Sequence, residues 1–175
     1  MTGGAILWYA GAMSSVLQVV PAGVLSVAYD VLADGQPKGR IEHGMLSMRG
    51  QALISTPDRT FTARRQKVLR SACVMETVDG DTRASAEKES FWREHYRVRF
   101  GETTLFLRQK LMSRWGLFQI FDGSGEIGGI RFERMLSRRM LVEYTTASPP
   151  PLEITEFLVW IVLMVHRRQA SEAPG

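Results

Sequence analysis

The sequence predicts a mainly β protein with one C-terminal helix, folded as a closed, roughly twelve-stranded β-barrel wrapped around a central hydrophobic α-helix. The first observation is a series of short segments in which apolar and polar residues alternate, separated by turns rich in glycine, proline and aspartate. The second is the segment 152–168, in which every residue from 157 to 165 is apolar. The third is the order of these elements, since about a dozen strands precede a single helix.

A helix that is apolar all round is buried on every side. The run at 157–165 is much shorter than the roughly 20 apolar residues that cross a bilayer, so we expect it inside the protein. An open sheet of about a dozen strands would expose its edges. A closed barrel of that size is too wide for its own side chains to fill. A barrel closed around the helix meets both requirements.

The N-terminal third predicts short strands joined by tight turns. We expect strands at 16–20 and 25–31, a hairpin within 45–54 with Arg49-Gly50 at its tip, and turns at 21–23, 34–35 and 56–59. Asp34-Gly35 is the strongest hairpin signal among them, because both residues tolerate the positive φ angles of a tight turn.

The middle of the chain contains the clearest period-two pattern, at residues 91–100. The two faces of this expected strand are Trp92, Tyr96, Val98 and Phe100 on one side, and Arg93, His95, Arg97 and Arg99 on the other. In the next segment, 103–111, Leu105, Leu107 and Leu111 alternate in the same way. Further strands are expected at 71–78, on both sides of a turn at 122–125 between residues 114 and 132, and at 138–146, with another turn at 79–81.

Prolines at 149–151 end the sheet pattern, because proline cannot donate to a strand ladder. We expect the helix at 152–168, in a single domain of residues 1–169, and a disordered tail at 170–175. The uncharged stretch from residue 3 to 29 leaves an alternative open. In that alternative the protein is membrane-anchored, through residues 5–29 or through the C-terminal apolar helix.

Composition and charge are those of an ordinary globular domain with a mild basic excess, a net charge of +4 and a pI near 9.6. Cys73 is the only cysteine, which excludes an intramolecular disulfide and indicates a reducing compartment. We therefore expect a cytoplasmic protein, peripheral to the membrane if it binds lipid. The apolar neighbours of Cys73 predict a small buried side chain.

Motifs for catalysis are lacking in the sequence. It contains no His-Glu-x-x-His, no Gly-x-Ser-x-Gly and no glycine-rich phosphate loop. The three histidines, His43, His95 and His166, fall on three different expected elements. We expect a non-enzymatic protein without a metal or cofactor, and an enzyme with a dispersed site is the alternative.

The segment 122–133 resembles a calcium-binding EF-hand loop, with Asp122, Ser124 and Glu126 at alternating positions and Glu133 at the twelfth. Its sixth position is Ile127, where the loop requires glycine, and its flanks predict strands in place of helices. The pattern therefore favours a hairpin turn over a calcium site.

Basic residues cluster at 64–70, 93–99 and 131–139, and convergence on one rim of the barrel would create a cationic surface. Such a surface attracts anionic lipid headgroups. The candidate lipid-binding residues are Arg64, Arg65, Lys67, Arg138 and Arg139. In the alternative, the arginines are solvated strand positions interleaved with acidic residues. Nucleic acid is disfavoured because no groove-reading helix or exposed aromatic platform is evident in the sequence.

Four segments resemble the Tubby C-terminal-like superfamily, in particular its LURP-one-related and phospholipid-scramblase-like branch of bacterial type. They are YDVLADGQPKGRI (29–41), HYRVRFGETTLFLRQKL (95–111), GLFQIFDGSGEIGGIRF (116–132) and LEITEFLVWIVLMVHRR (152–168). The resemblance implies a twelve-stranded barrel around a central C-terminal helix. It also implies an association with membrane lipids, since Tubby proteins bind phosphoinositides and scramblases are linked to lipid movement. We accordingly expect a barrel protein that binds anionic phospholipid or a protein partner through its basic exterior.

Overall fold

The computed structural model describes residues 15–24, 26–44, 50–67, 72–111, 116–134 and 137–172. Within these ranges the chain forms twelve strands and one helix. The strands are β1 (Ser15–Pro21), β2 (Ala28–Ala33), β3 (Gln36–His43), β4 (Ala52–Ser55), β5 (Thr60–Lys67), β6 (Ala72–Thr77), β7 (Thr82–Lys88), β8 (His95–Phe100), β9 (Thr103–Gln109), β10 (Phe118–Phe121), β11 (Glu126–Phe132) and β12 (Met140–Tyr144), and the helix is α1 (Leu152–Glu172).

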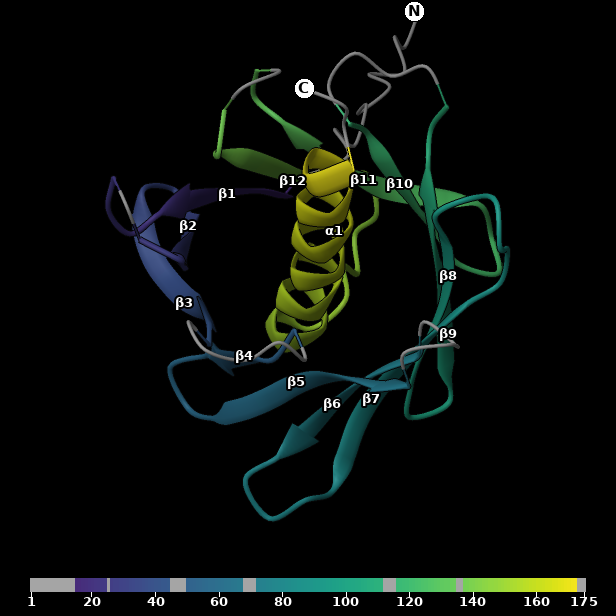
Figure 1. Cartoon of the computed structure of the whole chain (residues 1–175), viewed down its shortest axis with the longest axis horizontal. Helices are drawn as coiled ribbons and strands as arrows, with labels where there is room; N and C mark the ends of the chain where they lie inside the picture. The colour runs from purple at the N-terminus through teal and green to yellow at the C-terminus, as the bar shows by residue number, and fades with distance from the viewer. Residues whose placement is uncertain are drawn as a thin grey trace, which may run out of the picture.

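The strands form a closed antiparallel barrel that surrounds α1 (Figure 1). Each strand pairs with its neighbours in sequence, and β1 pairs with β12 from Ser15 opposite Tyr144 to Val19 opposite Met140. Closure leaves no unpaired edge, which is the solution expected for a sheet of this size. The predicted fold class, a mainly β closed barrel around one C-terminal helix, is confirmed.

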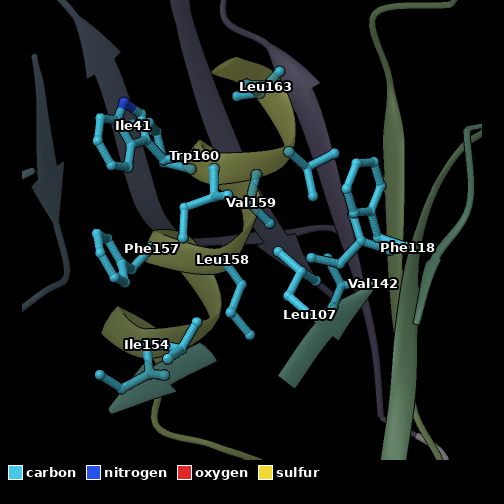
Figure 2. Packing of buried hydrophobic residues seen from close by; sticks show 14 of the residues in the cluster. Ile41, Leu107, Phe118, Val142, Ile154, Phe157, Leu158, Val159, Trp160 and Leu163 are labelled. Atoms are coloured by element: carbon cyan, nitrogen blue, oxygen red, sulfur yellow. The ribbon is translucent and has the colours of Figure 1, made fainter. Parts of the chain in front are cut away.

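Alternation along the strands sends apolar side chains inward, where they meet the helix. Ile154 and residues 157–163 of α1 are buried, as are the inward side chains of the strands around them. Figure 2 shows Ile41 of β3 beside Trp160, with Leu107, Phe118 and Val142 on the other side of the helix. The helix is therefore the core of the barrel, as its all-apolar sequence predicts.

Helix α1 continues to Glu172, four residues beyond the predicted end at 168. The tail expected from residue 170 thus begins as helix, and residues 173–175 lie outside the described ranges. Of the uncharged segment 5–29, residues 15–21 form β1 and residues 28 and 29 begin β2, whereas 5–14 and 25 lie outside the described ranges. Within the described parts of the chain, no helix has the length and apolar character needed to span a bilayer.

Because neighbouring strands are antiparallel, successive connections lie at opposite ends of the barrel. The turn end comprises the connections that follow β2, β4, β6, β8, β10 and β12. The loop end comprises the connections that follow β1, β3, β5, β7, β9 and β11. At the turn end, Asp34 and Gly35 form the predicted hairpin with φ angles of 51° and 74°.

Helix α1 runs from the turn end to the loop end. Near its start, the Thr155 hydroxyl is 2.9 Å from the Tyr144 hydroxyl at the turn-end terminus of β12. Near its end, Gln169 exchanges side-chain hydrogen bonds with Gln109, the last residue of β9. The last turns of the helix, residues 166–172, therefore lie at the loop end.

Candidate functional site

The two ends of the barrel carry opposite charge. The turn-end connections contain the acidic residues Asp34, Asp58, Asp79, Asp81, Glu102 and Asp122, and the basic residue Arg59. The described loop-end connections and residues 166–172 contain the basic residues Arg93, Lys110, Arg134, Arg138, Arg139, Arg167 and Arg168, and the acidic residues Glu89, Glu94, Glu133 and Glu172. Turn chemistry accounts for aspartate at tight turns, but it does not require arginine in the longer connections.

Two of the acidic residues at the loop end are neutralised within the fold. The Glu94 carboxylate accepts hydrogen bonds from Lys88 Nζ at 2.7 Å, from the Tyr96 hydroxyl at 2.8 Å and from Arg168. Burial works in the opposite direction, but these donors and the nearby cations hold the pKa of Glu94 below its usual range. Glu89 is paired with Arg97.

The Glu94 cluster also fastens the end of α1 to β7 and β8, because Arg168 belongs to the helix and Lys88 and Tyr96 to the two strands. The C-terminal end of α1 is thereby held against this side of the barrel.

Among the described residues, five exposed cations at the loop end have no carboxylate partner. Arg93, Lys110, Arg134, Arg139 and Arg167 are exposed, and none forms an ion pair with a residue that the structure describes. Two acidic residues there, Glu133 and Glu172, are likewise exposed and unpaired among the described residues. The exposed charge of this end is therefore predominantly positive.

Two arginines on the outer wall of the barrel, Arg64 and Arg131, are paired with carboxylates. Arg64 donates two hydrogen bonds of 2.9 Å to the Glu76 carboxylate across the β5–β6 pair, and Arg131 pairs with Glu143 across β11–β12. The hydrogen bonds from Arg64, followed by its charge, lower the pKa of Glu76. Both of these arginines are thereby neutralised by a carboxylate on the neighbouring strand.

The candidate lipid-binding residues thus separate into different environments. Arg64 is paired on the wall, whereas Arg65 lines a small cavity inside the loop end. Lys67 is the last residue of β5, and its side chain lies outside the described part of the structure. Arg138 and Arg139 lie together at the loop end, between β11 and β12.

Arg138 is mostly engaged in holding the fold. Its guanidinium donates a 2.8 Å hydrogen bond to the Val24 carbonyl and another to the Ser26 carbonyl, and it lies 5.5 Å from the centre of the Tyr29 ring. These contacts join the β11–β12 connection to the β1–β2 connection. Arg139 has an exposed side chain and is the member of this pair that is free to contact a ligand.

Exposed apolar side chains gather at the loop end, where strand alternation does not predict them. Trp92 and Leu111 are expected on the apolar sides of alternating strands, but both are exposed, at 88% and 63%. The assignment is wrong because β8 begins at His95 and β9 ends at Gln109, so alternation does not extend to either residue. Phe91 is 84% exposed and Val24 is 92% exposed. The remaining exposed large apolar residues of the described ranges are Val78 at the turn end and, on strands, the half-exposed Val16 and Leu53.

Polar groups inside the barrel offer little chemistry at neutral pH. Burial raises the pKa of the Cys73 thiol to about 12 despite the nearby Arg65. Burial, with a contribution from the Arg167 charge, lowers the pKa of His43 to about 4. The cavity beside Cys73 has a volume of about 20 Å³, enough for roughly one water molecule. Cys73 is a small buried side chain, as its apolar neighbours predict.

The residues of the EF-hand-like pattern are kept apart. Asp122 accepts hydrogen bonds from the backbone and hydroxyl of Ser124 and from the backbone of Gly125, as a turn-forming aspartate does. Glu133 lies beyond the far end of β11, a seven-residue strand that spans roughly 20 Å. The predicted hairpin is confirmed. Among the described residues, no cluster of three or more His, Cys, Asp or Glu side chains could hold a metal ion.

Comparison of the chain with protein-family models, with curated proteins and with solved structures finds no match.

Proposed function

We propose that the protein is a non-enzymatic peripheral membrane protein that binds anionic phospholipid through the loop end of its barrel. The observation that carries this proposal is the segregation of charge between the two ends. Carboxylates dominate the turn end, whereas exposed and unpaired cations dominate the loop end. The anionic inner leaflet of a cell is the surface to which such an end is complementary.

The magnitude of the attraction is sufficient for reversible binding. A basic residue close to an anionic membrane contributes about 1 kcal/mol, so the five unpaired cations supply on the order of 5 kcal/mol before orientation costs. The carboxylates of the turn end would be repelled by the same surface. Together these terms orient the barrel, with α1 pointing its C-terminal end at the membrane.

The barrel around a C-terminal helix is also the arrangement that the resemblance to the Tubby-like superfamily implies. This architecture supports the further proposal that the chain is a member of that superfamily. The contact surface proposed here is, however, the loop end. Arg64 and Arg131 of the outer wall are excluded from it because cross-strand carboxylates neutralise them.

Co-sedimentation with phosphatidylcholine vesicles, with and without phosphatidylserine, tests the proposal. The Lys110→Ala/Arg139→Ala double variant should lose about 2 kcal/mol of attraction, or roughly thirtyfold in partition to the anionic vesicles. The matched control is Arg59→Ala, which removes an exposed cation from the turn end and should leave partition unchanged. Arg138 is unsuitable for substitution because it also holds two backbone carbonyls.

Binding should weaken as salt rises above about 0.1 M, where the screening length is about 10 Å. Failure of the wild-type chain to bind anionic vesicles at about 0.1 M salt would refute the proposal. Equal losses in the double variant and in Arg59→Ala would also refute it, because charge would then act without regard to its position.

A further inference from the structure

Phe91 and Trp92 project from the loop end on a structured turn. The base of the turn is closed by a backbone hydrogen bond of 2.8 Å from Glu89 N to His95 O. The Ser90 hydroxyl accepts a hydrogen bond of 3.2 Å from the Arg93 backbone. The two rings contact each other edge to face, with their centres 5.1 Å apart. The aromatic pair is therefore held outward by the local fold.

No residue that the structure describes covers this pair, since both side chains are more than four-fifths exposed. Trp and Phe side chains each bury a large apolar area when they find a partner, and water contact with that area is unfavourable. Within the described ranges, the other exposed apolar residues with more than half their surface free are Val24, Leu111 and Val78, of which two share the loop end.

Apolar and cationic side chains follow one another along this rim. The β7–β8 connection with Trp92 and Arg93 is next to the β9–β10 connection with Lys110 and Leu111, because β8 and β9 are paired. The β11–β12 connection follows with Arg134 and Arg139, and beyond it the β1–β2 connection with Val24, to which Arg138 binds. Apolar and cationic side chains are thus interspersed over four neighbouring connections of the loop end.

We propose that Phe91 and Trp92, together with Leu111, insert into the headgroup and upper acyl layer of an anionic bilayer while the neighbouring cations contact its phosphates. This inference rests on the proposed function and specifies its partner as a lipid bilayer. Trp at the boundary between acyl chains and headgroups, next to Arg and Lys, is the residue combination of membrane interfaces. A second copy of the chain is a poor partner for the same face, because the unpaired cations of the two loop ends would repel each other.

The barrel docks in this arrangement with its loop end on the membrane. Insertion of Phe91 and Trp92 adds an apolar contribution to the free energy of binding. This contribution requires the acyl layer of a bilayer and is insensitive to salt. A soluble polyanion such as heparin offers charge without an apolar layer. The two kinds of partner are therefore distinguished by substitution of the aromatic pair.

The experiment compares the full-length wild type, Phe91→Ala/Trp92→Ala and the control Val78→Ala, which removes an exposed apolar side chain from the turn end. Partition to phosphatidylserine-containing vesicles should fall at least about tenfold in the double variant, while heparin affinity and thermal stability stay those of the wild type. Val78→Ala should leave all three quantities unchanged. Trp fluorescence should be quenched by lipids brominated in the upper acyl chain, and more weakly so in Trp92→Phe.

Several results would overturn the inference. Vesicle partition of the double variant within about twofold of the wild type, or equal losses toward vesicles and heparin, would show that the aromatic pair does not enter a bilayer. In those cases salt-sensitive vesicle binding by the wild type would leave the proposed function standing. Failure of the wild type to bind anionic vesicles would overturn both proposals.

Discussion

Replacement of Glu156 by glutamine is expected to remove a steep loss of stability between about pH 4.5 and pH 9. Glu156 lies in α1 inside the barrel with no exposed surface, and neither carboxyl oxygen has a hydrogen-bond partner among the described residues. Burial, and secondarily the Glu153 charge, raises the pKa of Glu156 from 4.5 to about 9. The carboxyl group is therefore protonated in the native state at neutral pH.

The sign of the effect follows from the two pKa values. Below pH 4.5 the group is protonated in both the folded and the unfolded states, so its contribution to stability is fully present. Between pH 4.5 and 9 only the unfolded state ionises, and the free energy of unfolding falls by about 1.4 kcal/mol per pH unit. The loss is on the order of 3 kcal/mol at pH 7 and about 6 kcal/mol at pH 9.

Urea unfolding across this pH range measures the effect as the difference in stability between the wild type and Glu156→Gln. The difference cancels the titration of all other groups, and Glu102→Gln, at an exposed position in the β8–β9 turn, is the control for removal of a surface carboxylate. A pH-independent difference between wild type and Glu156→Gln would refute the reasoning, because Glu156 would then ionise inside the barrel as it does in water.

Gly39 supplies an independent check on the position of this carboxyl. A Cβ atom added at Gly39 would lie 1.8 Å from Oε1 of Glu156 and 2.8 Å from its Cδ. Gly39→Ala should therefore destabilise the wild type by more than 1 kcal/mol, and most of this cost should vanish in a Glu156→Ala background. Equal costs in both backgrounds would place the carboxyl elsewhere.

Two further predictions concern the core. Trp160→Ala should lower the free energy of unfolding, measured in urea, by about 3–5 kcal/mol. The reason is that Trp160 is fully buried and stacks on Phe157, with the ring centres 5.7 Å apart. Unchanged stability would mean that the helix is not the core of the barrel. The Cys73 thiol should resist Ellman's reagent at pH 8 in the native protein and react once the chain is unfolded, because burial raises the pKa of this thiol to about 12. Rapid reaction of the native protein would contradict the buried position.

Local patterns account for most of the fold that could be predicted. Period-two alternation identifies β8 through Tyr96 and Val98, and Asp34-Gly35 identifies the β2–β3 turn. The same patterns fail at Trp92 and Leu111. Alternation separates two faces only while a strand remains in its ladder, and the sequence does not show where the ladder stops.

The candidate site could be predicted only in part. Arg139 was identified from the density of basic residues around it, but so was Arg64, which Glu76 neutralises. The difference between them is a matter of strand register. Residue 64 faces residue 76 as a diagonal neighbour across two paired strands, and this proximity depends on pairing that local sequence does not specify.

The sequence by itself determined the strands, their turns and a helix too apolar to face water, because each depends on neighbours within a few residues. Only the tertiary structure decided which residues meet. Closure of β1 on β12 and the antiparallel order of the strands bring Val24, Trp92, Leu111 and Arg139 to one end of the barrel, although more than a hundred residues separate the first from the last. Long-range pairing also decided that Glu156 would lie against Gly39, with no charged partner among the described residues. The physical reason is that side-chain alternation is local, whereas barrel closure and register are properties of the whole chain.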